Sequence, residues 1–179
     1  VRGPQVMRGY WEDPEATRAV LDPEGWFDTG DLVRRTLRDD LVFCGRAKDT
    51  IVLRGGENVE PEPLEQSALA SPLIAQIVVV GQDRKALGAL VWPDPDEAAR
   101  RLGDAAGDGA LLLAAVRGGL AERDGPQGGF RPWERVPHVA LLPEELTVAD
   151  GLLTATLKVK RGEVLRRHAA RIDALFDRT

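Results

Sequence analysis

The stretch Gly45–Glu65, which reads GRAKDTIVLRGGENVEPEPLE, most constrains how this 179-residue chain can fold. Its charged beginning is followed by Thr50–Leu53, an apolar and β-branched segment typical of a strand. The glycine pair that follows allows a positive φ or the close approach of another molecule. The two later prolines suit the first turn of a helix, where a missing N–H costs little. The stretch therefore predicts a strand, a glycine turn and a helix in succession.

Composition limits the class of protein. The chain has 24 Lys and Arg against 29 Asp and Glu, a net charge of −5, so we expect no nucleic-acid partner. Its single cysteine, Cys44, excludes an internal disulfide and fits a reducing, cytoplasmic location. No apolar run approaches the roughly 20 residues of a membrane span, which leaves peripheral membrane contact open. The chain starts at Val1 in what reads as mid-domain sequence, so we expect a C-terminal piece of a longer protein.

The first 46 residues read as strands and turns, with a short helix through Glu15–Val20. Asp31–Thr36 and Leu41–Cys44 are predicted to be two strands joined by a polar turn. A hairpin is only marginally stable alone, so we expect it to lean on a sheet outside this chain. Residues 1–46 are thus predicted to be a β-rich remnant of a larger domain.

Residues 47–179 are expected to form a small α+β domain. The nearly continuous apolar runs Ile74–Val80 and Ala86–Trp92 predict a hairpin that is covered on both faces. A further strand is predicted at Val136–Leu142. A loop-rich connector is expected at 122–136. The flanking helices are expected at Pro61–Ala70, from Asp94 or Asp96 through Leu102, around Leu112–Leu120 with its continuity in question at Gly118-Gly119, and at Val164–Phe176.

The stretch GRAKDTIVLRGGENVEPEPLE also resembles the hinge motif of the adenylate-forming superfamily, which includes acyl-CoA synthetases, luciferases and the adenylation domains of peptide synthetases. Its wording is most similar to that of long-chain fatty-acid–CoA ligases. The resemblance implies that the second part of the chain is the mobile C-terminal lid domain, an α+β fold with a three-stranded antiparallel sheet, flanking helices and a β-hairpin. It also implies that Lys48 is the pivot of the lid, and that Gly55, Gly56 and Glu57 form the turn that admits coenzyme A.

A second motif, GWFDTGD, resembles the ribose-binding motif of the same family. A carboxylate on a tight glycine turn can accept hydrogen bonds from two vicinal hydroxyls. By resemblance, Asp31 binds the ribose of ATP or of the acyl-adenylate, and Arg46 lies close to the same nucleotide. The alternative is an ordinary turn and a surface cation.

The segment LTATLKVKR, residues 153–161, resembles the loop that carries the adenylation lysine of the family, with Ala155 in place of the usual proline. The resemblance places the catalytic role on Lys158. A lysine suits this role because it carries a compact charge on a flexible stem and can stabilise charge that develops in the transition state. In an extended segment Lys160 would point to the same side, so spacing alone does not separate the two. The alternative is a basic, solvated loop.

The resemblance implies two half-reactions. A fatty acid attacks the α-phosphate of Mg²⁺–ATP, giving acyl-AMP and pyrophosphate, and the thiol of coenzyme A then displaces AMP. The phosphate loop and the acyl pocket would lie in the missing N-terminal domain, so we expect this chain alone to be inactive and its acyl chain length to stay unassigned. His138 and His168 are isolated, so no metal site is expected in the chain. The alternatives are a fatty acyl-AMP ligase, a carrier-protein-loading adenylation domain, and a non-catalytic binding module.

Overall fold

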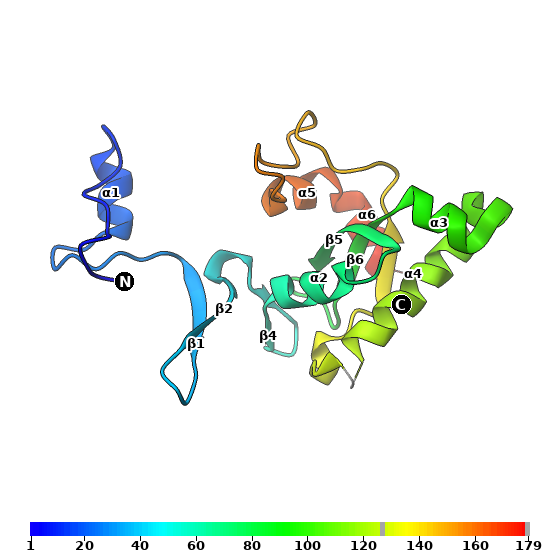
Figure 1. Ribbon diagram of the computed structural model, residues 1–179, viewed down its shortest axis with the longest axis horizontal. Helices are drawn as coiled ribbons and strands as arrows, with labels where there is room; N and C mark the ends of the chain where they lie inside the picture. The colour runs from blue at the N-terminus through cyan, green and yellow to red at the C-terminus, as the bar shows by residue number, and fades with distance from the viewer. Residues whose placement is uncertain (126–127, 178–179) are drawn as a thin grey trace. The chain divides into compact units, whose positions relative to one another are not determined.

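A computed structural model of the protein describes residues 1–125 and 128–177, which form two compact units (Figure 1). Unit 1 comprises Val1–Lys48 and unit 2 comprises Asp49–Thr179. The division falls after Lys48, whereas the sequence placed it after residue 46.

Unit 1 is built from one helix and one hairpin. Helix α1 (Pro14–Val20) begins after Asp13, whose carboxylate accepts a hydrogen bond from the Ala16 N–H at 2.8 Å. Strands β1 (Asp31–Arg35) and β2 (Leu41–Arg46) pair antiparallel. The predicted hairpin is confirmed, and β2 continues to Arg46, two residues beyond the predicted end at Cys44.

Unit 2 begins with a second small hairpin. The 3₁₀ helix η1 (Ala47–Asp49) leads into β3 (Ile51–Val52), which pairs antiparallel with β4 (Asn58–Val59), and α2 (Pro61–Leu69) follows. The predicted order of strand, glycine turn and helix is confirmed. The sequence did not indicate β4, because two residues are too few to show a periodicity.

The main sheet of unit 2 has the order β5-β6-β7. Strands β5 (Ile74–Val80) and β6 (Gly88–Pro93) form the predicted antiparallel hairpin, but β7 (His138–Leu141) runs parallel to β6. The α+β class is confirmed, whereas the expectation of an all-antiparallel sheet is wrong. The long helical connection between β6 and β7 explains the difference, because a parallel neighbour requires a crossover of a dozen or more residues.

Three helical segments form this crossover, namely α3 (Pro95–Leu102), η2 (Gly103–Gly107) and α4 (Gly109–Asp124), and the short η4 (Pro132–Glu134) precedes β7. Helix α3 is capped by Asp94, one of its two expected caps. Helix α4 continues through both glycines, where a break was in question. A Cβ on Gly119 would lie 3.2 Å from the Ser71 Oγ, so glycine permits close packing there. Pro126 and Gln127 of the predicted connector lie outside the described residues.

The C-terminal helical segment consists of two helices rather than the single one expected. Helix α5 (Arg161–Arg167) ends at His168, whose φ of −105° and ψ of 19° interrupt the helix, and α6 (Ala169–Phe176) continues from there. The sequence predicted an inward face of Leu165, Ala169, Ile172 and Phe176. All but Ala169, which is exposed, pack against an apolar cluster. The apolar spacing contained no signal for the break.

The sheet separates two apolar clusters. This arrangement was predicted, because its strands are apolar on both faces. Alternate residues of β5, such as Ile77 and Val79, face the cluster that contains α2 and α4. Their neighbours Val78 and Val80 face the cluster that contains α5, with α6 packed against it. Helices therefore cover both faces of the sheet (Figure 1).

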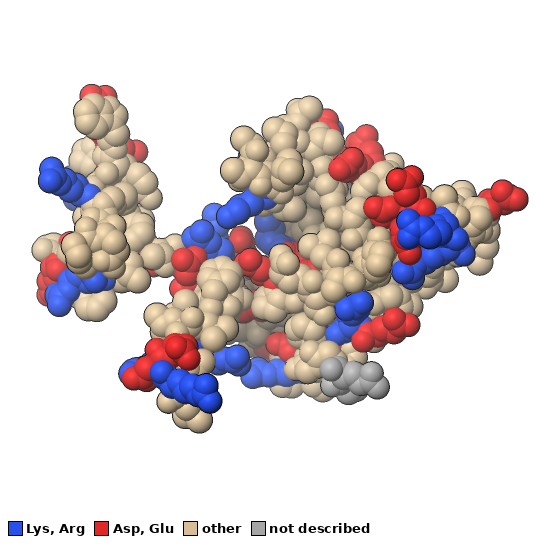
Figure 2. All heavy atoms as spheres, in the orientation of Figure 1, with Lys and Arg blue, Asp and Glu red and all other residues tan. Residues whose placement is uncertain are grey.

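Both signs of charge are interspersed on the face of each unit that Figure 2 shows. Among the described residues, no helix is both long enough and apolar enough to pass through a bilayer.

Candidate functional site

The hairpin of unit 1 brings Asp31 and Arg46 together. They are Cα partners at the open end of the hairpin, and the Arg46 Nη1 lies 3.0 Å from the Asp31 Oδ1. This Oδ1 is buried and accepts no aligned hydrogen bond, so the contact is an ion pair without hydrogen-bond geometry. Arg46 instead donates to the Thr29 carbonyl at 2.9 Å. The structure thus joins the two predicted nucleotide-binding residues, and the Asp31 side chain stays partly exposed beside Arg46.

The Thr29-Gly30-Asp31 turn is held by side chains of its own segment. Gly30 has a φ of +67°, which favours glycine, and its N–H donates to the Asp28 Oδ1 at 2.8 Å. The Asp31 N–H donates to the Thr29 Oγ1 at 3.2 Å. Sequence reasoning overlooked Asp28, although an Asp two residues before a turn glycine is a known turn signal.

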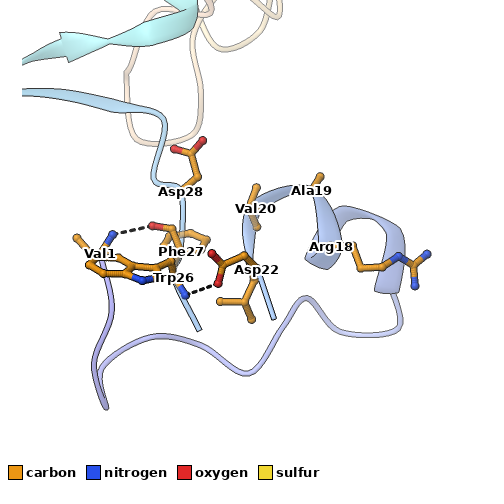
Figure 3. A pocket seen from close by; sticks show the side chains of 9 residues that line it. Val1, Arg18, Ala19, Val20, Asp22, Trp26, Phe27 and Asp28 are labelled. Carbon is orange, nitrogen blue, oxygen red and sulfur yellow. Dashed lines mark hydrogen bonds between the residues drawn. The ribbon is translucent and has the colours of Figure 1, made fainter. Parts of the chain in front are cut away.

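A cavity of about 290 Å³ lies next to this turn. Figure 3 shows its lining, in which the Trp26 N–H donates to the Asp22 Oδ1 at 2.8 Å while the Asp28 carboxylate points away. The amino group of Val1 forms part of its wall, through a 2.8 Å bond to the Phe27 carbonyl.

Lys48, the predicted pivot, is exposed in the three-residue η1 at the point where the two units divide. No long rigid element contains it. A hinge requires a few connecting residues that can absorb a change in φ and ψ, and this location meets that requirement.

The Gly55–Glu57 segment forms the turn of the β3–β4 hairpin. The Gly56 N–H donates to the Leu53 carbonyl, and the Leu53 N–H donates to the Glu57 carbonyl, both at 2.9 Å. Gly56 has a φ of +89°, and a Cβ added to it would meet nothing within 4 Å. Both glycines are exposed. The turn therefore presents bare backbone that another molecule can approach closely.

The lysine loop, defined here as residues 153–160, is a tight hairpin that is closed by a bridge between Leu153 and Val159. Thr154 fixes the backbone of Lys158 in both directions. The Thr154 N–H donates to the Lys158 carbonyl at 2.8 Å, and the Lys158 N–H donates to the Thr154 Oγ1 at 3.1 Å. The Lys160 N–H donates to the Leu152 carbonyl at 2.8 Å. Both lysines are exposed, and within residues 1–125 and 128–177 neither forms an ion pair.

The conformation of Leu157, next to Lys158, is unfavourable for folding. Its φ is 61°, in the left-handed region that a leucine rarely occupies, and it is 71% exposed. Such backbone strain costs about 1–3 kcal/mol and concentrates at functional sites. The strained tip of the lysine loop is therefore a candidate functional segment.

The glycine turn and the lysine loop are both attached to the C-terminal end of β5. The hairpin that carries the glycine turn bonds to the residues after β5, since the Asp83 N–H donates to the Val52 carbonyl and the Arg54 N–H to the Arg84 carbonyl. Arg161, directly after the lysine loop, donates to the Val79 carbonyl at 2.7 Å and pairs with Glu65 of α2.

Sequence reasoning missed the pair of Glu65 and Arg161. The sequence did offer a signal: Glu65 ends the hinge motif, Arg161 ends the lysine-loop motif, and the two residues carry opposite charges.

The pKa of His168, which lies at the break between α5 and α6, differs from its ordinary value. Burial and the nearby positive charges of Arg171 and Arg167 lower its pKa below 6.5, and Glu144 opposes them. Its Nε2 is buried and has no hydrogen-bond partner among residues 1–125 and 128–177. In the part of the chain that the structure describes, no group of three or more His, Cys, Asp or Glu side chains could hold a metal ion.

Comparison with known families defines the class of protein. Residues 48–108 match the AMP-binding enzyme C-terminal domain. Together with the ligase relatives below, this match shows that the chain belongs to the adenylate-forming superfamily and corresponds to its C-terminal part.

Several curated proteins resemble almost the whole chain. A chloroplastic long-chain-fatty-acid–[acyl-carrier-protein] ligase of Arabidopsis thaliana is 39% identical over 98% of this chain and 25% of its own length. A long-chain-fatty-acid–CoA ligase of Mycobacterium tuberculosis is 36% identical over 99% of this chain and 31% of its own length. Human long-chain-fatty-acid–CoA ligase 1 is 33% identical over 98% and 26%. The chain thus spans about a quarter to a third of these relatives.

Solved structures show the same fold. The adenylation domain of the carboxylic acid reductase from Segniliparus rugosus, in complex with AMP and a carboxylic acid, has a TM-score of 0.84 and 30% identity, covering 97% of this chain and 27% of that one. The corresponding domain from Mycobacterium chelonae has a TM-score of 0.85 and 30% identity over 95% and 26%.

Proposed function

We propose that this chain is the C-terminal part of an ATP-dependent ligase that activates long-chain fatty acids as acyl-adenylates and transfers the acyl group to coenzyme A. The proposal rests on the lysine loop: Lys158 is exposed and fixed by Thr154 on both sides, and it follows a strained leucine. That arrangement fixes the backbone of a lysine whose side chain forms no ion pair with the described residues, and adenylation requires such a cation.

In the first half-reaction a fatty carboxylate oxygen forms a bond to the α-phosphorus of Mg²⁺–ATP, and the bond to pyrophosphate breaks. Two anions approach each other, so a positioned cation lowers the barrier by stabilising the charge that builds up between them. We assign this role to Lys158. Mg²⁺ would arrive with the triphosphate of ATP.

Unit 1 would hold the sugar of the nucleotide. The Asp31 side chain is 28% exposed, and its carboxylate would accept hydrogen bonds from the ribose hydroxyls. Arg46 neutralises this carboxylate and so reduces its repulsion of the nearby phosphates.

In the second half-reaction the thiol of the acceptor attacks the acyl carbon, AMP leaves, and the thiol proton is lost. We propose that the lid turns about Lys48, which withdraws the Lys158 loop and brings the Gly55–Glu57 turn to the reacting group. The bare glycine backbone would give a narrow pantetheine arm room to pass.

A carrier protein is the second candidate acceptor, since the Arabidopsis thaliana relative, at 39% identity, is named as an acyl-carrier-protein ligase. Coenzyme A and the carrier protein would both present a phosphopantetheine thiol. The glycine turn suits either.

The intact protein tests the proposal. We expect fatty-acid-dependent exchange of pyrophosphate into ATP, and thioester formation with coenzyme A in excess over that with a phosphopantetheinylated carrier protein. The reverse preference would identify the carrier-protein ligase, and nucleotide binding without exchange would identify a non-catalytic module. The isolated 179-residue chain should catalyse neither step; acyl-CoA formed by it would contradict our placement of the pocket outside the chain.

A further inference from the structure

We propose that Glu65 and Arg161, together with the backbone of Val79, form a clamp that positions the lysine loop for adenylation. This inference rests on the proposed function of Lys158. It adds two positioning residues, which act through the loop and need not touch the substrates.

The three members of the clamp are bonded to one another. The Glu65 Oε1 accepts from the Val79 N–H at 2.7 Å, the Arg161 Nη1 donates to the Val79 carbonyl at 2.7 Å, and the Arg161 Nη2 pairs with the same Glu65 oxygen. β5 is the edge strand of its sheet, so an outward N–H and C=O there have no neighbouring strand. Glu65 and Arg161 satisfy these two groups on Val79.

The clamp is better shielded from solvent than the other ion pairs of the described residues. Both of its side chains are 15% exposed, whereas the Arg166–Glu163 pair on α5 is 76% and 46% exposed. Exposed pairs are screened and contribute little. A shielded pair with three hydrogen bonds holds its geometry more firmly.

The clamp also holds the open end of the lysine loop. At its N-terminal end the loop begins with the buried Leu153, which follows the buried Leu152. On the other side it ends at Arg161, three residues after Lys158, so the Lys158 Cα lies within about 10 Å of the clamp. Loss of the clamp would release that second end from β5, while the bridge between Leu153 and Val159 and the bond from the Lys160 N–H to the Leu152 carbonyl still join it to the first end.

The clamp therefore attaches the lysine loop to β5, next to the glycine turn, which is held separately by Asp83 and Arg84. Glu65 belongs to the helix that follows the glycine turn, and Arg161 follows the lysine loop. The clamp makes the two motifs move together with β5, so rotation about a hinge can exchange one for the other.

Half-reaction kinetics of the intact protein test the clamp. Glu65→Gln and Arg161→Met should each slow acyl-AMP formation about 10-fold to 100-fold, because a misplacement of about 1 Å can cost that much. Thioester formation from supplied acyl-AMP should stay within about twofold, since it does not use Lys158. Arg161→Lys keeps the charge but replaces the planar two-nitrogen guanidinium by a single nitrogen, so it should fall between Met and the wild type. The matched controls are Glu163→Gln and Arg166→Met on the exposed pair, which should resemble the wild type.

Hydrogen exchange gives a second readout that does not depend on turnover. The amides of residues 153–160 should exchange faster in both clamp variants and at the wild-type rate in the controls. Unchanged exchange and unchanged adenylation, alongside a crippled Lys158→Ala variant, would overturn the clamp alone. An equal loss of both half-reactions would show that the Glu65–Arg161 pair only stabilises the fold, and would also overturn the clamp proposal. Full adenylation by Lys158→Ala would overturn the assigned role of the loop and the clamp together.

Discussion

Replacement of Lys158 by alanine should slow adenylation without changing the free energy of unfolding of the protein. The Lys158 side chain is exposed and forms no ion pair with any residue that the structure describes. Its backbone bonds to Thr154 do not involve the side chain. Surface changes of this kind alter the free energy of unfolding by less than about 0.5 kcal/mol.

The expected loss of adenylation is much larger than that. Removal of one positioned donor from a developing anion costs about 2.7–4 kcal/mol, or 10²-fold to 10³-fold in rate. Lys158→Ala should therefore slow acyl-AMP formation by that factor and leave thioester formation from supplied acyl-AMP nearly unchanged. Single-turnover measurements of each step, with the unfolding midpoint in urea measured in parallel, check both parts.

Lys160→Ala is the matched control. Lys160 is also exposed and lies only two residues away, and its N–H bonds to the Leu152 carbonyl, a contact that alanine keeps. We expect its adenylation rate to stay within about twofold of the wild type. A larger loss for Lys160→Ala than for Lys158→Ala would exchange their roles, and equal damage to both half-reactions by Lys158→Ala would refute the reasoning.

Two further changes test other parts of the proposal. Lys48→Pro fixes φ at the point where the two units divide. Thioester formation should therefore fall at least about tenfold more than adenylation, a barrier difference of about 1.4 kcal/mol. Equal losses in half-reaction assays would argue against Lys48 as the pivot. Burial and the positive charges of Arg171 and Arg167 lower the pKa of His168 in the folded chain, against the opposing effect of Glu144. As the pH falls through 6.5, the unfolded state therefore takes up a proton on this histidine before the folded state does. The free energy of unfolding should decrease in that pH range. Urea unfolding at several pH values should show a loss that His168→Gln reduces, with His138→Gln as the control; an identical pH dependence in His168→Gln and the wild type would contradict this account.

Local residue patterns were sufficient for much of the fold and of the candidate site. The β-branched segment before Gly55 and the prolines after it predicted β3, the turn and α2, because each preference acts within a few residues. The two apolar runs predicted β5 and β6 with both faces covered, since neither run alternates with polar residues. The motif resemblance selected Lys158, Asp31 and Lys48 before any geometry was known, and their catalytic roles remain predictions.

Only the tertiary structure decided how distant segments meet. The direction of β7 depends on where its helical crossover returns to the sheet, and the spacing of its own residues contains no information about that. The break at His168 arises within a segment whose apolar spacing suits one helix. The bond between Glu65 and Arg161 joins residues 96 positions apart through the edge of a strand that neither motif contains. Periodicity reports which face of an element is buried, whereas the partner on that face is set by the packing of the whole unit.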